Sequence, residues 1–458
     1  MFDEGAPETS IIHTEKVKSE RKFSDSEKRP FVEPSKTSVD VAVGDPNAVF
    51  VKMRRNFFDF VKTARDKLVG EQHPKFKRIS KFHGRNMTEA SSSAKVLWSG
   101  NESGDIYGAW GVKGGSMDTP EGMKVEQDSE HYYGIHGWGL MDDSCVPRIN
   151  MASLYMRRNG LPTERVRQVD VIKEVWINRK DKKEKTVMYK VPIHEWEESE
   201  VNRLQKEVDE DVEKGLQPWA EDKAMVLEKV KKYLKETEFI TIKRDLQVDE
   251  RIRDIADAAK NDKLKVALSP VLKWVNIAIE KRSFGMLSNS AKSERFDPGN
   301  DDDIYRYLIR WLPSQMGAYL GKFHGIGLTH RFLHDQNWSA VGTIYDLDSV
   351  SGKGVFTSDE EPSQQDIDRD VFDTMDGITA LVTRDLPKTR EFNNRPAENM
   401  VIEATTLYLQ NYLTQRFDKD GALAEIDRLK RVYGASFILP GVWDNLQREF
   451  APKSSAGK

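Results

Sequence analysis

The order of patterns along the chain constrains its fold more than any single motif does. Residues 95–140 mix glycine with aromatic and apolar residues, which predicts short strands joined by tight turns. A helix follows, with Pro147 at its start and Gly160 just past its end. More strand-like sequence comes next, and helical patterns dominate from Asp301 onward. This order predicts an α+β chain built in two parts.

Composition excludes several classes of protein. The 458 residues carry 71 Lys and Arg against 75 Asp and Glu, and this balance gives no reason to expect a nucleic acid partner. The single cysteine, Cys145, rules out an internal disulfide framework and a cysteine-based zinc site. The sequence has no run of about 18 apolar residues, so we expect no membrane span. The first residues lack a signal-peptide pattern. We therefore expect a cytoplasmic protein with no membrane partner.

Composition also divides the chain into four parts. These are a polar tail (1–46), a strand-rich part with one helix (47–178), a charged insertion (179–262) and a helical part (263–458). The tail holds 7 basic and 10 acidic residues and few large apolar ones, which is typical of disorder. Apolar residues at helical spacing predict a helix over Val49–Leu68. The insertion is predicted to be helical, and the apolar residues 264–287 are predicted to form strands. The part 263–458 as a whole is predicted to comprise a hinge and a helical lobe.

The densest polar cluster lies between His324 and Asp348, directly after a predicted helix. It contains three of the nine histidines, one asparagine and three aspartates. Asn337 and Asp346, separated by a turn at Gly342, carry hard oxygen ligands of the kind that Mg²⁺ takes together with phosphate oxygens. Asp348 is a further candidate metal ligand. The segment therefore predicts a site for Mg²⁺ and a nucleotide.

The same segment has the frame of the protein-kinase catalytic loop, H-R-D-x-x-x-x-N. His330 through Asn337 fit this frame, but Phe332 stands where the aspartate is expected. Asp346-Leu347-Asp348 stands where the kinase D-F-G would lie.

A kinase-type site also needs a lysine on an upstream strand and a group that accepts a proton. Lys113, in the segment G-V-K-G-G, is the candidate lysine. Asp335 and His334 are the candidate catalytic groups, because either can accept the proton of a hydroxyl acceptor.

Two other interpretations of the cluster stay open at this point. A zinc site would use His330 and His334, with His324 or Asp335 as a third ligand, although the sequence lacks H-E-x-x-H. The cluster can also be a structural polar turn between a helix and a hairpin.

Several segments together resemble the selenoprotein O family. Asn337 to Asp346 fits its pattern N-x-S-x-x-G-x-x-x-D with the same spacing, and Val112-Lys113-Gly114 resembles its L-K-G segment. Arg148 through Arg165, ending in N-G-L-P-T-E-R, resembles its helix with the exit L-G-I-P-T-T-R. Arg282-Ser-Phe284-Gly285 resembles its R-F-G segment. These pieces cover about a third of the chain in the family's order.

The resemblance implies a two-lobed, kinase-like fold that binds ATP in a reversed pose and transfers AMP to hydroxyl groups. It also implies that Lys113 and Arg282 contact the phosphates, while Asn337 and Asp346 hold Mg²⁺. The acceptor is then a protein or a small hydroxyl compound.

The chain departs from the family in two respects. Gln336 stands where the family has an aspartate that acts as the base, and Ile149 and Leu154 stand where its helix has glutamates. These departures favour altered or lost catalysis.

A second resemblance and two further functions remain as alternatives. His334-Asp-Gln336-Asn337 is similar to the H-x-Q-N of siderophore synthetases, which are ATP-dependent adenylating ligases. The chain can also be an inactive pseudokinase that engages a protein, or an assembly protein that binds no nucleotide.

Overall fold

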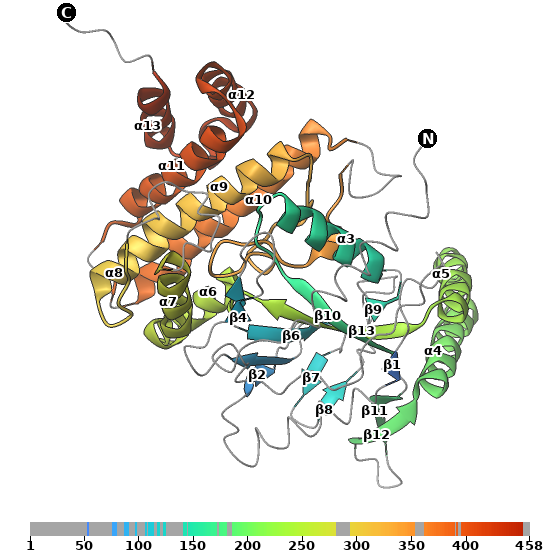
Figure 1. Cartoon of the computed structure of the whole chain (residues 1–458). Coiled ribbons are helices and arrows are strands. Elements are labelled where there is room, and N and C mark those ends of the chain that lie inside the picture. Colours follow the sequence, from blue (N-terminus) through green and yellow to red (C-terminus); the bar gives the residue numbers. More distant parts are fainter. Residues whose placement is uncertain are drawn as a thin grey trace, which may run out of the picture.

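The computed structural model describes residues 141–451, together with the backbone of short strands between residues 53 and 124. The described range has gaps at 144, 172–173, 181–185, 281–293, 353–360, 390 and 393–394. This part is α+β, mostly helical, with a small and largely antiparallel sheet (Figure 1). The α+β prediction is therefore confirmed.

The strands described before residue 141 are β1 (Met53–Arg54), β2 (Phe76–Ile79), β3 (Met87–Ala90), β4 (Leu97–Trp98), β5 (Ile106–Tyr107), β6 (Ala109–Lys113), β7 (Met117–Thr119) and β8 (Gly122–Lys124). The predicted short strands within 95–140 are thus confirmed up to residue 124, and 125–140 lie outside the described residues. The helix predicted over Val49–Leu68 is wrong at Met53–Arg54, which form β1, and the other residues of that segment are not described. The predicted tail, 1–46, also lies outside the described residues.

The main sheet has the strand order β1-β10-β13-β6-β3-β2. Strand β10 (Arg165–Val171) pairs antiparallel with β13 (Phe239–Leu246), which in turn pairs with β6. The short β9 (Met141–Asp142) pairs with the start of β13, and β1 runs parallel to β10. Although β13 falls inside the predicted insertion 179–262, it is a central strand of this sheet.

Helix α3 (Cys145–Arg158) follows the strands, as the sequence predicts. Pro147 sits in its first turn, where a missing N–H costs no hydrogen bond. Gly160 adopts φ +70° just beyond its end, and the N–H of Leu161 donates to the carbonyl of Met156 at 2.9 Å. An apolar face of α3 packs into the core through Ile149, Ala152 and Met156.

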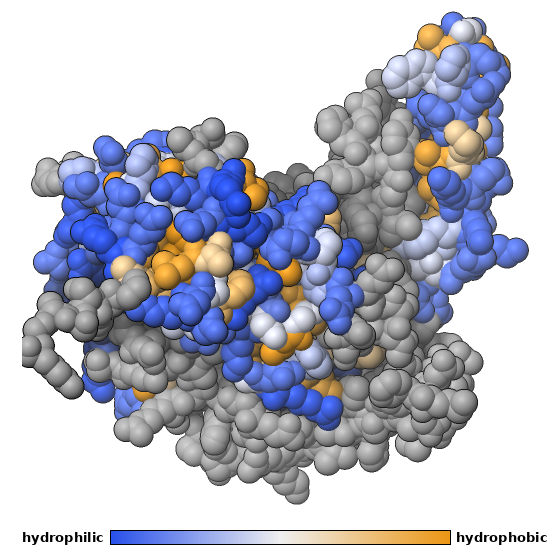
Figure 2. Space-filling model, turned by 90° about the horizontal axis from the view of Figure 1, so that it is seen from above, coloured by the Kyte–Doolittle hydropathy of each residue, from blue (hydrophilic) through white to orange (hydrophobic). Residues whose placement is uncertain are grey.

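The charged region forms a β-hairpin and a helical hairpin. Strands β11 (Glu174–Lys180) and β12 (Thr186–Pro192) lead into α4 (Ile193–Glu213) and α5 (Gln217–Glu236), which meet at a turn around Gly215. The pair α4–α5 lies at the side of the molecule (Figure 1), and from above it projects with a mainly hydrophilic surface (Figure 2). The predicted helical character of this region is confirmed for 193–236.

Residues Leu264–Glu280 form helix α7, so the prediction of strands over 264–287 is wrong in that range. The segment is rich in β-branched residues, which favour strands, but its apolar residues recur at helical spacing. The side chains on that spacing are all buried: Leu264, Leu268, Leu272 and Val275. The helical spacing of the apolar residues therefore determines the structure of this segment, in spite of the strand preference of its β-branched residues.

The helical part is built around two long, closely packed helices, α9 and α11. Its elements are α6 (Ile252–Lys260), α7, α8 (Asp301–Tyr305), the π-helical turn η3 (Arg306–Trp311), α9 (Leu312–Gly325), η4 (Leu347–Ser349), α10 (Gln364–Ala380), η5 (Leu381–Asp385), η6 (Leu386–Lys388), α11 (Ala397–Arg416), α12 (Lys419–Phe437) and α13 (Pro440–Phe450). Gly317 lets α9 approach α11, because a Cβ there would lie 2.0 Å from the carbonyl oxygen of Tyr408. The helices predicted from Asp301 onward are confirmed.

Candidate functional site

The loop after α9 folds into a hairpin, Asn337–Tyr345, that places the two predicted metal ligands together. The N–H of Tyr345 donates to the carbonyl of Asn337 at 2.9 Å, and Gly342 makes the turn at φ +71°. Asp346 is the next residue, so its backbone lies one position from the residue paired with Asn337. The nine-residue spacing therefore brings Asn337 and Asp346 to the same end of the hairpin.

Asn337 and Asp346 have the properties of a constrained site. Asn337 is 4% exposed, and its side-chain N–H donates to the carbonyl of Phe332 at 2.8 Å, which leaves its side-chain oxygen as the acceptor. Asp346 is partly buried and has φ +70°, a left-handed conformation that costs a non-glycine residue about 1–3 kcal/mol. Asp348 follows in the 3-10 turn η4 and is also partly buried.

A buried histidine links the start of the loop to Asp346. Nε2 of His330 lies 3.0 Å from the carbonyl oxygen of Asp346 and 3.2 Å from that of Tyr345. Because carbonyl oxygens only accept hydrogen bonds, Nε2 carries the proton and donates. Because His330 is fully buried, it supports the backbone of Asp346 from inside the protein and does not face a substrate.

Asp370 on α10 anchors the other side of the loop, and sequence reasoning missed it. Its carboxylate accepts the backbone N–H groups of His330 at 2.7 Å and of Arg331 at 2.6 Å. The ring of His324 lies 3.3 Å from the same carboxylate and 3.1 Å from the hydroxyl of Tyr412. Arg331, like Asp346, has a positive φ, of 68°. One buried carboxylate thus fixes the strained turn that leads to Asn337.

The two predicted catalytic residues lie in different environments. Asp335 is engaged by Arg253 of α6, through an ion pair at 3.3 Å between their side chains and a 3.1 Å hydrogen bond from the N–H of Arg253 to the Asp335 carbonyl. The side chain of His334 is 52% exposed. Burial lowers the pKa of His334 below its ordinary value of 6.5, although the carboxylates of Asp335 and Asp346 raise it. His334 is therefore neutral at pH 7 and close to Asp346.

The sheet carries the predicted lysine and a buried ion pair that the sequence did not reveal. Lys113 ends β6 and pairs with Ile242 of β13, whereas Arg282 lies outside the described residues. Two positions along β13, Arg244 forms a salt bridge with Glu164, and both side chains are fully buried. Among the described residues, Nε and Nη2 of Arg244 have no hydrogen-bond partner.

Helix α3 supplies no carboxylate to this region. Ile149 and Leu154 are 1% and 2% exposed and belong to its apolar packing. Glu164, which follows α3 in the segment N-G-L-P-T-E-R, is fully buried and pairs with Arg244 of β13. The sequence shows that segment clearly, but gives no sign of which side chain is buried.

The zinc interpretation does not hold in the described structure. Nε2 of His330 faces two carbonyl oxygens, both ring nitrogens of His324 are engaged, and Nδ1 of His334 accepts the N–H of Gln336 at 3.3 Å. The described part of the chain contains no group of three or more His, Cys, Asp or Glu side chains arranged to hold a metal. Mg²⁺ differs, because one or two protein oxygens suffice when phosphates and water complete its shell.

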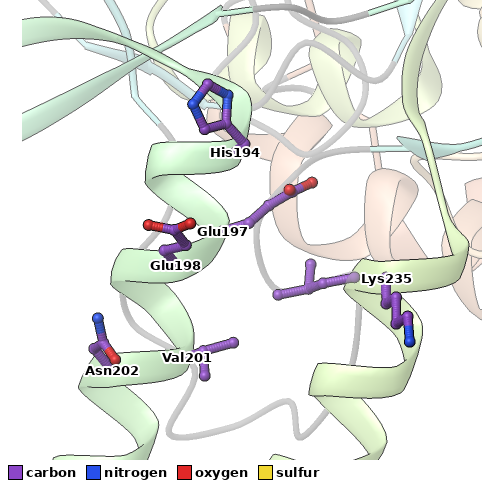
Figure 3. Close-up of a pocket in the computed structure, with 7 residues that line it drawn as sticks. His194, Glu197, Glu198, Val201, Asn202 and Lys235 are labelled. Atoms are coloured by element: carbon purple, nitrogen blue, oxygen red, sulfur yellow. The ribbon is translucent and has the colours of Figure 1, made fainter.

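A cavity of about 470 Å³ lies at the α4–α5 hairpin and is lined by none of the residues of the His324–Asp348 cluster. Glu197 points from α4 toward α5, whereas Glu198 and Asn202 point away (Figure 3). Burial raises the pKa of Glu197 to about 7, and His194 partly offsets this. The cavity holds a titratable group, but the candidate nucleotide residues are elsewhere.

No protein-family model matches the chain, and no curated protein matches it. Every helix within the described ranges is too short or too polar to cross a lipid bilayer.

Proposed function

We propose that the chain is an ATP- and Mg²⁺-dependent transferase with a two-lobed, kinase-like fold that moves AMP, or a phosphoryl group, to a hydroxyl acceptor. The observation that carries this proposal is the placement of Asn337 and Asp346 at one end of a hairpin, next to the hydrogen-bonded pair Asn337–Tyr345, in a segment that His330 and Asp370 hold in a strained conformation. Asn337 and Asp346 supply the hard oxygen ligands that hold Mg²⁺, with Asp348 nearby. Bound Mg²⁺ neutralises the charge that develops on the phosphates.

The order of the elements supports the kinase-like part of the proposal. A strand that ends in Lys113 comes first, helix α3 second, and β10 and β13 third, with β13 paired to the lysine strand. The connection to α6 and the loop with Asn337 and Asp346 follow. Protein kinases present their lysine, helix, catalytic loop and D-F-G in this order.

Arg244 supports the binding of phosphate. Its buried guanidinium is partly neutralised by Glu164, yet two N–H donors remain without a partner among the described residues. Buried donors of this kind are costly when unsatisfied, and phosphate oxygens are their preferred partners. Arg244 also lies opposite Gly111, two residues before Lys113.

The transfer step needs a proton acceptor. In AMP transfer, the acceptor oxygen bonds to the α-phosphorus, the bond from that phosphorus to pyrophosphate breaks, and the hydroxyl proton passes to a base. We assign this role to Nδ1 of His334 rather than to Asp335, because His334 is neutral and half exposed while Asp335 is paired with Arg253. Nδ1 must then exchange its 3.3 Å hydrogen bond from the N–H of Gln336 for one from the acceptor hydroxyl.

A pseudokinase is the second candidate, and Phe332 favours it. This side chain stands where the kinase loop carries its aspartate, and it is 49% exposed. Arg369 lies over its ring, 5.1 Å from the centroid. An aromatic surface at this point can contact a protein but cannot accept a proton.

ATP labelled separately at the α and γ phosphates distinguishes these functions. We expect the α label to appear on a protein or small hydroxyl acceptor, and to be lost with Asp346→Ala. Transfer of the γ label instead identifies a phosphotransferase. Binding of ATP without transfer of either label identifies the pseudokinase, and absence of binding refutes the nucleotide site.

A further inference from the structure

The turn between α4 and α5 carries an exposed apolar cluster. It consists of Val212, Leu216 and Trp219, which are 50%, 44% and 64% exposed and are called the hairpin tip below. In the part of the chain that the structure describes, seven large hydrophobic side chains are exposed, and three of the seven belong to this tip. Seen from above, hydrophobic residues gather at the far end of the projecting hairpin (Figure 2). This end of the hairpin is therefore an apolar surface in contact with water.

A tight turn keeps the three residues at one end of the hairpin. The N–H of Gly215 donates to the carbonyl of Val212 at 3.0 Å, which closes the last turn of α4. Gly215 has φ +73°, a conformation that suits glycine. The N–H of Ala220 donates to the carbonyl of Leu216 at 3.0 Å, so Trp219 lies in the first turn of α5. Backbone hydrogen bonds thus fix the tip in place.

The hairpin packs without using its tip. Helix α5 buries a separate set of apolar residues, Leu227, Val230 and Leu234. At the other end of the hairpin, the ring of Trp196 is fully buried and lies edge to face with Phe239 of β13, with 5.6 Å between the ring centroids. Folding therefore leaves the tip uncovered. An exposed apolar group that includes a tryptophan is typical of a surface that binds another protein.

The charge around the tip indicates the kind of partner. Residues 209–223 contain six acidic side chains and two lysines. Both lysines are paired within the hairpin, Lys223 with Asp211 at 2.8 Å and Lys214 with Glu210 at 3.6 Å. The remaining four carboxylates are exposed and form no ion pair with the described residues: Asp209, Glu213, Glu221 and Asp222.

This acidic surround disfavours several occupants of the tip. A second copy of the chain would bring the same carboxylates together, and like charges at an interface repel. Anionic lipid surfaces and nucleic acids are repelled for the same reason. A segment that carries Lys or Arg beside apolar side chains complements both features of the surface. A helix is the element that places an apolar stripe next to a basic face.

We propose that the hairpin tip is a docking surface for a partner protein that presents a basic amphipathic helix. The apolar stripe of that helix covers Trp219 and its two apolar neighbours, and its basic side chains face the exposed carboxylates. The tip contains none of the candidate nucleotide residues, so this inference is independent of the proposed function.

Binding of a synthetic peptide to the full chain tests the proposal. The probe is a fluorescein-labelled peptide of about 14 residues with Leu at helical spacing and Lys at the other positions, and the control peptide has Glu in place of each Lys. By fluorescence anisotropy, we expect the Lys peptide to bind with a dissociation constant of about 100 μM or below, and the Glu peptide at least about tenfold more weakly. Equal binding of the two peptides, or no binding of the Lys peptide at millimolar concentration, overturns the proposal.

Variants at the tip separate its apolar part from its charges. Trp219→Ala should raise the dissociation constant of the Lys peptide about tenfold or more. The double variant Glu213→Gln, Asp222→Asn should raise it about threefold at low salt and have little effect at high salt. Val266→Ala, at an exposed apolar residue of α7, is the matched control and should leave it unchanged. An unchanged constant in Trp219→Ala, or an equal rise in Val266→Ala, overturns the proposal.

Two further measurements examine the other occupants. Cosedimentation of the full chain with phosphatidylserine vesicles and its mass by light scattering should show neither lipid binding nor a dimer formed through the tip. Lipid binding that Trp219→Ala abolishes, or a dimer that the same variant dissociates, would overturn the proposal.

Discussion

The carboxylate of Asp370 accepts a 2.6 Å hydrogen bond from the backbone N–H of Arg331, thirty-nine residues earlier in the chain. Arg331 has φ +68°, a conformation that an L-residue adopts only when its surroundings enforce it. Helix α10 therefore sets the geometry of the loop that carries Asn337, although α10 contributes no predicted ligand.

Removal of this anchor should destabilise the protein. Asp370→Ala eliminates two short hydrogen bonds from a buried carboxylate to backbone N–H groups, and charge-assisted bonds contribute about 1.5–3 kcal/mol each. We expect the free energy of unfolding in urea to fall by about 2–5 kcal/mol. Asp376→Ala, at an exposed position of the same helix, is the matched control and should change it by less than about 0.5 kcal/mol. Equal losses in the two variants would contradict the anchoring role.

Close contact between α9 and α11 gives a second test of stability. Gly317→Ala places a methyl group against the Tyr408 carbonyl, and overpacking of this kind costs about 1–3 kcal/mol. Gly325→Ala on the same helix has no atom within 4 Å of the new Cβ, so it should be neutral or stabilise by up to about 1 kcal/mol. Thermal unfolding of both variants checks the prediction, and a stabilised Gly317→Ala would show that the helices are not packed this closely.

Glu197 should make stability depend on pH. Burial raises its pKa from 4.5 to about 7, so the folded state disfavours the ionised form. Its contribution is fully present below pH 4.5 and is lost as pH rises to about 7. Because the residue is only half buried, we expect Glu197→Gln to be more stable than wild type at pH 8 by about 1 kcal/mol, and to match it near pH 4.5. Urea unfolding at both pH values measures this, and a pH-independent difference would contradict it.

His334 should determine how the rate of any transfer reaction falls at acidic pH. The neutral imidazole accepts the proton, and burial lowers the pKa of this ring below 6.5, so activity should be constant at neutral pH and fall only below pH 6.5. With His334→Gln the rate should drop about 10²–10⁴-fold, and this acid limb should vanish. Rates with labelled ATP between pH 5 and 8 give the answer. An unchanged profile in the variant would move the base elsewhere.

The sequence predicts the site segment better than the residues that hold it. Asn337, Gly342 and Asp346 follow a local pattern, and the structure forms the turn at the predicted glycine. Asp370 is one of several aspartates along α10, and only tertiary packing distinguishes it. Glu164 and Tyr345 are similarly visible but unassigned, because burial and partners depend on segments distant in sequence.

Secondary structure is likewise predictable from the sequence where the signals are local, and not where it depends on distant segments. Pro147 and Gly160 bound α3 because proline and glycine act locally. The apolar run that contains α7 is predicted to form strands, yet the buried side chains recur at helical spacing. The central position of β13 depends on pairing with β6 and β10, which no local pattern specifies.

Thermal unfolding with and without Mg-ATP tests the central claim most directly. A ligand at 100 times its dissociation constant stabilises the folded state by about 2.7 kcal/mol, which is a shift of several degrees. The shift should occur in wild type and in Asp222→Asn, an exposed control on α5, and should be lost in Asp346→Asn. No shift in wild type at millimolar Mg-ATP, or an equal shift in Asp346→Asn, would contradict a nucleotide site built on Asn337 and Asp346.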